Sequence, residues 1–251
     1  MGFEGAYRTG IPPWDIGRAQ PAIVHLADEG RIAGDVIDIG CGTGENALHL
    51  ASRGLAVVGV DAAPTAIAQA REKARLRGSS ATFLVGDALA LEGLARTFDT
   101  AIDCGLFHTF SDADRLRFER SLHAALGAGG RYVLLCFSEL QGGELGPRRV
   151  TQAEIRSTFA TGWTVESIVA ERFAARLPGG GAHAWLALLT RTRAGGRTCR
   201  RSGGAGWWSG GRASTDEHAV DRNHHDAADH RDHDALDIDA GHVGDLEDGA
   251  G

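Results

Sequence analysis

Three glycines at alternate positions, Gly40, Gly42 and Gly44, follow a short apolar run at residues 36–39. Because glycine has no Cβ atom, these residues let the backbone turn tightly and approach a ligand closely. A glycine-rich turn between a strand and a helix occurs in sites for several nucleotide-containing ligands. The charged residues beside the loop are therefore needed to distinguish among those ligands.

Two carboxylates flank this loop, Asp38 before it and Glu45 after it. A loop that binds a pyrophosphate offers backbone N–H groups and a helix dipole to an anion, and carboxylates would repel that ligand. S-Adenosylmethionine carries a sulfonium and an ammonium group and no phosphate, so negative charge here favours it over a dinucleotide. An alternative for Glu45 is that it only complements the dipole of the helix that it begins.

Two further acids follow the next apolar runs. Asp61, with Ala62 after it, can accept hydrogen bonds from both ribose hydroxyls of an adenosine ligand. Asp87 can accept from the adenine amino group, with the backbone amide of Ala88 beside it. Each acid taken alone could be a turn-forming residue, but three successive strands that each end in an acid favour an adenosine site.

Apolar segments alternate with helical patterns before residue 192, which predicts a parallel sheet with helices on both faces. Strands are expected at 36–39, 56–60, 81–85, 98–104, 131–137, 163–170 and 183–190, and helices at 45–53, 65–77, 112–126 and 151–159. The last two strands are joined only by a loop, so they should pair antiparallel. The predicted fold class is a doubly wound α/β sheet with its ligand at the carboxyl ends of the strands.

A set of ordered motifs resembles that of the class I S-adenosylmethionine-dependent methyltransferases: 36–44 (VIDIGCGTG), 57–61 (VVGVD), 86–88 (GDA), 98–103 (FDTAID) and 126–137 (LGAGGRYVLLCF). The resemblance covers nearly all of residues 30–192. It implies an enzyme with S-adenosylmethionine as cofactor and a Rossmann-like, mostly parallel, seven-stranded sheet whose last strand is antiparallel. The chain has Ala128 where the family commonly has proline, in a turn away from the cofactor contacts.

The segment before the first strand contains Pro12-Pro13-Trp14, and residues 104–108 read CGLFH. Together they resemble the small-molecule branch that includes thiopurine, halide/thiol and heterocyclic-toxin methyltransferases. This resemblance implies that Trp14 folds over the methionine end of the cofactor and closes the acceptor pocket; alternatively, Trp14 anchors a packed N-terminal helix. The expected cofactor contacts are Trp14, Asp38, Gly40, Cys41, Gly42, Gly44, Asp61, Ala62, Asp87, Ala88 and Cys104.

The methyl acceptor is expected to be a small-molecule nucleophile: a thiol, a halide, or the hydroxyl or nitrogen of an aromatic heterocycle. In-line alignment and exclusion of water can supply most of the rate, but a hydroxyl or amine gains from a base. His108 follows the fourth expected strand and can titrate near neutral pH, so it is the candidate catalytic base; alternatively, it only shapes the pocket. Cys104 is expected to pack against the cofactor and not to act as a nucleophile.

The formal net charge of −7 and the lack of a basic run argue against nucleic acid or an anionic membrane surface as a partner. Four scattered cysteines without CxxC spacing, no signal-peptide pattern and no bilayer-spanning apolar stretch predict a reduced, cytoplasmic protein. The oligomeric state is left open. The competing functions are methylation of a macromolecule, an NAD-dependent oxidoreductase, and a non-catalytic module that binds S-adenosylmethionine.

Three regions are expected along the chain: an N-terminal lid at residues 1–30, a methyltransferase domain at 31–194 and a disordered low-complexity tail at 195–251. The tail is rich in Gly, Arg, His and Asp and lacks apolar periodicity, so it cannot bury enough surface to offset its ordering entropy. Its histidines do not repeat the spacing of a helical ligand set, so no metal site is predicted. The histidines of the tail include His224, His225, His230 and His233.

Overall fold

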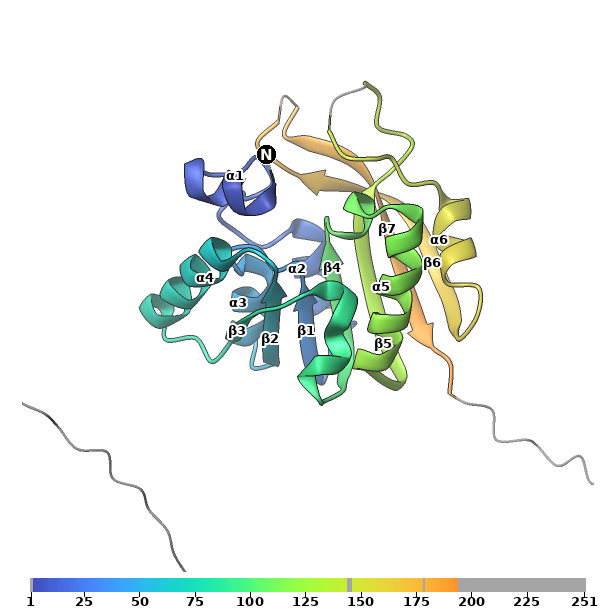
Figure 1. The fold of residues 1–251 in the computed structure, drawn as a ribbon, viewed down its shortest axis with the longest axis horizontal. Helices are drawn as coiled ribbons and strands as arrows, with labels where there is room; N and C mark the ends of the chain where they lie inside the picture. The colour runs from blue at the N-terminus through green and yellow to red at the C-terminus, as the bar shows by residue number, and fades with distance from the viewer. Residues whose placement is uncertain (1, 144–145, 178, 194–251) are drawn as a thin grey trace, which may run out of the picture. The chain divides into compact units, whose positions relative to one another are not determined.

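In the computed structural model, which describes residues 2–143, 146–177 and 179–193, seven strands form one sheet (Figure 1). The order across the sheet is β3-β2-β1-β4-β5-β7-β6. The strands are β1 (Asp35–Ile39), β2 (Ala56–Asp61), β3 (Thr82–Val85), β4 (Phe98–Cys104), β5 (Leu126–Phe137), β6 (Trp163–Ala174) and β7 (Gly181–Arg191). The predicted tail at 195–251, with its histidines, lies outside the described residues.

The pairing of the strands confirms the predicted fold class. β1 is parallel to β2 and β4, β4 is parallel to β5, and β7 is antiparallel to both β5 and β6. β5 and β6 extend furthest beyond their predicted bounds. β5 begins at Leu126, which pairs with Phe98 before the register shifts, and β6 continues to Ala174, which pairs with Gly181 of β7.

The sheet buries both of its faces, and successive strand residues point to opposite sides. Val36 and Val57 pack on one face with α2 (Pro21–Asp28), α3 (Glu45–Ser52) and α4 (Pro64–Arg77). Ile37 and Val58 pack on the other face with η1 (Ala88–Leu94), α5 (Asp112–Ala125) and α6 (Gln152–Thr158). Strands covered on both faces must be apolar at nearly every position, which explains the apolar runs in the sequence.

Local signals fix where the helices begin. Pro64 occupies the first turn of α4, where its missing N–H costs no helical hydrogen bond. α6 begins with a capping box, since Glu154 N donates to Thr151 Oγ1 at 3.1 Å and Thr151 N donates to Glu154 Oε2 at 2.7 Å. Within the described residues, no helix has the length and apolar character needed to cross a bilayer.

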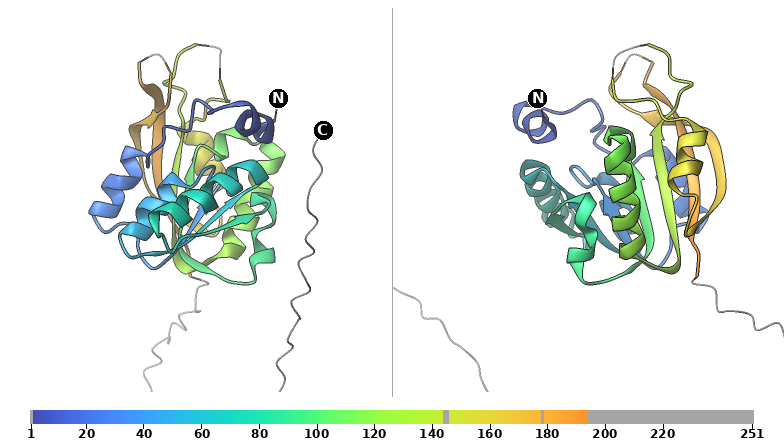
Figure 2. Two further views of the ribbon diagram at one scale, coloured as in Figure 1. Left: turned by 90° about the vertical axis from the view of Figure 1, so that its left-hand side faces the viewer. Right: turned by 45° about the vertical axis from the view of Figure 1, so that its right-hand side comes forward.

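The N-terminal region contains a helix that the sequence did not predict, α1 (Phe3–Thr9). Figures 1 and 2 show α1 beyond the carboxyl ends of the parallel strands, at the same end of the sheet as the end of β6 and the start of β7. The Glu4 carboxylate joins α1 to α4, accepting from Thr65 Oγ1 at 2.6 Å and from Thr65 N at 3.1 Å. A short helix, η2 (Phe107–Thr109), was also not predicted and follows β4 at this end.

The contact of α5 with the sheet gives a test of the fold. Phe118 is fully buried in α5, whereas Leu116 in the same helix is 53% exposed. We expect Phe118→Ala to lower the free energy of unfolding by about 3–5 kcal/mol, because it leaves a cavity in the core. Leu116→Ala is the control and should change it by about 0.5 kcal/mol or less. Equal effects of the two substitutions in denaturant titrations would contradict this packing.

Candidate active site

A cavity of about 860 Å³ lies at the carboxyl ends of the parallel strands. Its walls come from α1, residues 13–20, the loop after β1, the ends of β2, β3 and β4, η2, and the ends of β5, β6 and β7. The volume is near the upper end of the range for ligand pockets, about 300–1,000 Å³. It therefore has room for a nucleoside-sized ligand and a second small molecule together.

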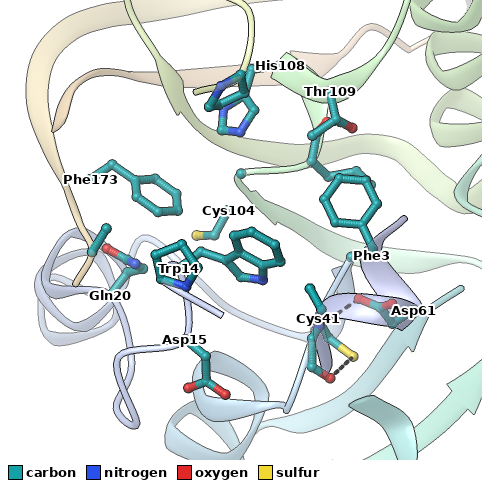
Figure 3. Close-up of a pocket in the computed structure, with 18 of the residues that line it drawn as sticks. Phe3, Trp14, Asp15, Gln20, Cys41, Asp61, Cys104, His108, Thr109 and Phe173 are labelled. Atoms are coloured by element: carbon teal, nitrogen blue, oxygen red, sulfur yellow. Dashed lines mark hydrogen bonds between the residues drawn. The ribbon is translucent and has the colours of Figure 1, made fainter. Parts of the chain in front are cut away.

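The structure brings most of the residues singled out in the sequence to this one cavity. In Figure 3, Asp61 and Cys41 lie toward one end of the view and His108 toward the other, with Trp14 and Cys104 between them. Asp38 and Gly44 are the two that do not line the cavity. Those that do are Trp14, Gly40, Cys41, Gly42, Asp61, Ala62, Asp87, Ala88, Cys104 and His108.

The loop after β1 can be built only from glycine at its alternate positions. Gly40, Gly42 and Gly44 have φ angles of 70°, 53° and 84°, in the left-handed region that other residues rarely adopt. A Cβ on Gly42 would lie 2.6 Å from Tyr7 Oη, and one on Gly44 would lie 2.6 Å from the ring of Phe83. The loop backbone is thus exposed to the cavity on one side and closely packed on the other.

Asp61 both supports this loop and faces the cavity. Its Oδ2 accepts from Gly42 N at 2.8 Å, and its Oδ1 accepts from Ala63 N at 2.8 Å. Each carboxylate oxygen can accept a second hydrogen bond, so Asp61 keeps the capacity to receive two hydroxyls from a ligand. Burial raises the pKa of this carboxyl despite those two backbone donors.

Asp87 is exposed at the next strand end and lines the same part of the cavity. Its Oδ1 accepts from Leu89 N at 2.8 Å and so caps η1. This is the turn-forming role that the sequence left open. It uses one oxygen of the carboxylate, and the other is available to a ligand.

Asp38 does not present a negative charge to the cavity, as the sequence argument required. The side chain is 1% exposed, and its Oδ2 has no hydrogen-bond partner among the described residues. Burial, aided by the nearby carboxylates of Asp103 and Asp61, raises the pKa of Asp38 to about 8. The carboxyl is therefore predominantly protonated at neutral pH and lies behind the cavity wall, so it supplies little negative charge to a ligand.

Glu45 lines the cavity but its charge is already compensated. Lys73 Nζ and Arg77 Nη1 on α4 each lie 2.8 Å from one of its carboxylate oxygens. Burial opposes ionisation of Glu45, but the hydrogen bonds from Arg77 and Lys73 outweigh it and lower its pKa. The sequence argument that Glu45 presents a free negative charge to a cationic ligand is therefore wrong.

Even so, the part of the cavity formed by residues 40–88 fits a phosphate-free adenosine ligand. Its lining includes the carboxylates of Asp61 and Asp87 and the Cβ-free backbone of Gly40 and Gly42. No lysine or arginine is among the described residues of this lining, so a pyrophosphate would have no cationic partner here.

The segment between α1 and α2 covers the cavity. Trp14 Nε1 donates to Tyr7 Oη at 2.9 Å, and the Trp14 ring stands edge-on to the rings of Phe3 and Tyr7. Asp15 Oδ2 accepts from Thr43 Oγ1 at 2.7 Å, which joins this segment to the glycine loop. Trp14 therefore lines the cavity and also packs against α1; its contact with the cofactor stays a prediction.

Gln20 holds the other end of this segment, and the sequence did not single it out. The side chain is 5% exposed; its Nε2 donates to Ala174 O at 2.9 Å and its Oε1 accepts from Ala174 N at 3.0 Å. Its own backbone N–H donates to Asn46 Oδ1 at 2.9 Å. A side-chain amide that pairs with one distant peptide group leaves no pattern in a single sequence.

His108 is held in a geometry that argues against its predicted role as a base. Its Nδ1 accepts the backbone N–H of Phe137 at 3.0 Å, and the side chain is 6% exposed. A neutral imidazole whose Nδ1 is an acceptor carries its proton on Nε2. Burial, with positive charge from Arg115 and Arg149, lowers the pKa of His108 to about 3. The ring is therefore neutral at pH 7, and Nε2 is a donor with no lone pair for a proton.

The two cysteines of the cavity wall are not activated. Burial raises the pKa of the Cys41 and Cys104 thiols well above the ordinary value. Both therefore stay protonated at neutral pH, which makes them poor nucleophiles. The predicted packing of Cys104 against the cofactor stays a prediction.

Comparison with known proteins places the chain among methyltransferases. Residues 36–130 match the family model of a methyltransferase domain. The chain is 39% identical over 176 residues to the 2-heptyl-1-hydroxyquinolin-4(1H)-one methyltransferase of Mycobacteroides abscessus, an alignment that covers 66% of this chain and 78% of that protein. It is 31% identical over 139 residues to a probable thiol methyltransferase 2 of Arabidopsis thaliana, covering 54% of this chain and 61% of the plant protein.

Solved structures agree on the fold. One, reported for the conversion of a disulfide bond into a thioacetal group during echinomycin biosynthesis, is 40% identical with a TM-score of 0.70 and covers 76% of this chain and 91% of the other. The magnesium protoporphyrin IX methyltransferase of Synechocystis with bound S-adenosylhomocysteine has a TM-score of 0.56 at 19% identity, covering 68% of this chain and 80% of the other. At that identity the likeness concerns the fold alone.

The buried Asp38 predicts a pH dependence of stability. A carboxyl whose pKa is raised on folding binds more protons in the folded state, so stability is lost as pH rises from about 4 toward 8. Asp38→Asn cannot titrate and should flatten this part of the curve of unfolding free energy against pH. Glu92→Gln removes an exposed carboxyl on the surface and is the control, which should leave the curve unaltered. An Asp38→Asn curve parallel to that of the unaltered protein would refute the argument.

Proposed function

Because this chain belongs to the class I S-adenosylmethionine-dependent methyltransferases, we propose that its methyl acceptor is a small molecule. The acceptor class is a thiol, a halide, or the hydroxyl or nitrogen of an aromatic heterocycle. The observation that carries this proposal is the aromatic character of the cavity beyond the glycine loop. Its lining there includes Trp14, Phe110, Phe137 and Phe173, an apolar enclosure of the kind that binds small molecules.

The relatives support the same acceptor class. The Mycobacteroides abscessus protein is named for a hydroxylated quinolone and the Arabidopsis thaliana protein for thiols. A further relative, from Brassica oleracea, is named for thiocyanate. All three names describe small acceptors with a soft or weakly acidic nucleophilic atom.

The cofactor contacts follow from the geometry of the loop and strand ends. Asp61 would receive the ribose hydroxyls, and Asp87 with the Ala88 amide would receive the adenine edge. The backbone at Gly40 and Gly42 would lie against the methionine half, near the thiol side chains of Cys41 and Cys104. When bound, S-adenosylmethionine supplies an electrophilic methyl group, and the residues of this chain bind it, orient it and exclude water from it.

Residues 1–30 act as a lid in this proposal, and residues 31–194 form the catalytic domain. The lid rests on the Trp14–Tyr7 hydrogen bond, the Asp15–Thr43 hydrogen bond and the double hydrogen bond of Gln20 with Ala174. The Trp14–Tyr7 hydrogen bond joins two residues of the lid, the Asp15–Thr43 hydrogen bond joins the lid to the glycine loop, and the Gln20–Ala174 pair joins the lid to β6. The lid thereby encloses the methionine half of the cofactor and the acceptor together.

A transfer assay tests the acceptor class. Purified protein with methyl-labelled S-adenosylmethionine should label members of a panel of thiols, halides and hydroxylated aromatic heterocycles, because the aromatic half of the cavity accommodates such molecules. Label found instead in the protein or nucleic acid of an added lysate would indicate a macromolecular acceptor. Tight binding of S-adenosylmethionine with no transfer to either would favour a non-catalytic binding module.

The ribose contact can be tested without catalysis. Asp61→Ala should weaken binding of S-adenosylhomocysteine by about tenfold or more, because hydrogen bonds to a charged group are lost. Asp61 also accepts a hydrogen bond from Gly42 N, so its substitution would disturb the glycine loop as well as the ribose contact. An analogue of S-adenosylhomocysteine that lacks both ribose hydroxyls separates these two effects. In calorimetry, removing the hydroxyls should cost affinity in the unaltered protein and much less in Asp61→Ala. Equal costs in the two proteins would remove Asp61 from the ribose site.

A further inference from the structure

The part of the cavity lined by residues from 104 onward, the acceptor half, contains a hydrogen-bond donor. This donor is Nε2 of His108, and the fold fixes its direction. Because Nδ1 of His108 accepts the Phe137 N–H, the proton of the neutral ring resides on Nε2. Nε2 makes no hydrogen bond within the described residues, and the ring lines the cavity. The rings of Phe137 and Phe173 lie 4.8 Å and 6.2 Å from it, so its surroundings are apolar. A donor in such a place requires an acceptor atom on the ligand.

Two guanidinium groups act on His108, and one of them, that of Arg115, is also paired with Glu154 Oε1 at 3.1 Å. Arg115 of α5 and Arg149 of the segment before α6 both act on the ring, whereas β5 and β6 present the apolar side chains of Phe137 and Phe173. The Arg149 guanidinium lies 5.8 Å from the centre of the Phe137 ring and lines the cavity. The N–H donor of His108 itself favours an ionised acceptor atom, because a hydrogen bond to an anion is stronger than one to a neutral hydroxyl or thiol.

Nothing in this half of the described lining can take a proton at neutral pH. From residue 104 onward the lining contains no aspartate or glutamate among the described residues. The Cys104 thiol is held protonated by burial, Arg149 is a cation, and His108 has its only lone pair engaged by Phe137. The carboxylates of the cavity, Asp15, Glu45, Asp61 and Asp87, all belong to the lid, to the glycine loop and α3, or to the ends of β2 and β3.

We propose that this protein methylates the ionised form of an acidic hydroxyl or thiol on an aromatic heterocycle, and that His108 selects this anion as a fixed Nε2–H donor without acting as a base. The inference rests on the proposed function and narrows its acceptor class. The nucleophile's lone pair forms the bond to the methyl carbon as the methyl–sulfur bond breaks, with its electron pair left on sulfur. The negative acceptor and the positive sulfonium give two neutral products, so the protein moves no proton.

The first test uses the protein without any substitution. A series of ring-substituted hydroxyquinolines and thiophenols, with different acidities of their own, is assayed for kcat/KM against pH. Each profile should rise to a plateau with a midpoint that follows the acidity of the acceptor itself. One midpoint shared by all acceptors between pH 5 and 8 would reveal a base on the protein and overturn the inference, while leaving the proposed function intact. Failure to methylate any member would instead count against the proposed function.

The second test separates a donor from a base at residue 108. His108→Gln retains an acceptor for the Phe137 N–H and a donor toward the cavity but cannot act as a base, whereas His108→Phe has neither polar group. We expect His108→Gln to keep most of the kcat/KM for an acidic acceptor and His108→Phe to lose about tenfold or more. Equal losses in the two variants, with thermal unfolding and S-adenosylhomocysteine binding unchanged, would overturn the donor role.

Binding without turnover gives a readout that does not depend on activity. With S-adenosylhomocysteine in place of the methyl donor, calorimetry should show acceptor affinity increasing as pH rises through the acceptor's own ionisation. This preference for the anion should be smaller in His108→Phe. In addition, ¹⁵N NMR of the His108 ring should show Nε2 protonated and Nδ1 unprotonated from pH 5 to 8. A ring that titrates within this range would contradict the fixed donor.

Discussion

The site depends on the attachment of the glycine loop to the neighbouring strand. Gly40 N and Cys41 N both donate to Val60 O, at 2.8 Å and 3.1 Å, and Gly42 N donates to the Asp61 carboxylate. These bonds bend the chain sharply between β1 and α3, in a conformation that needs positive φ at three residues. As a result, one side chain at the end of β2 both shapes the loop and faces the ligand. The glycine loop and the Asp61 side chain thus form a fixed wall of the cavity, and the lid and the acceptor half are arranged around this wall.

The fold was predictable because its determinants are periodic and local. Both faces of the central strands are covered, so these strands appear as mainly apolar runs, and proline and the Thr151–Glu154 capping box mark helix starts. The parts that were missed lack such periodicity. α1 has seven residues and is held mainly by contacts with α4 and Trp14, and η1 and η2 are short turns that follow strand ends. Their formation depends on tertiary contacts that a sequence pattern does not contain.

For the site, the sequence located the right edge of the sheet but assigned charge incorrectly. The sequence alone does not show the environment of a carboxylate. In the structure, Asp38 is buried and largely neutral, and Glu45 forms an ion pair with Lys73 of α4. A signal for the second case existed, since Lys73 and Arg77 are four residues apart on the next helix and so share one face. No such signal marks the Phe137–His108 hydrogen bond, which joins a backbone N–H to a ring 29 residues earlier and reverses the role expected for that histidine.

The order of strands has a consequence for how the site is assembled. β7 lies between β5 and β6, so the edge of β5 stays unpaired until nearly the last described residues of the chain have been added to the sheet. The Gln20–Ala174 contact spans 154 residues, and it too must wait for β6. Contacts between residues so distant in sequence form slowly, because the entropy cost of closing the loop comes before the contact that compensates for it. During synthesis the glycine loop and its strands can therefore fold first, and the pocket acquires its final wall and its cover only when the C-terminal hairpin docks.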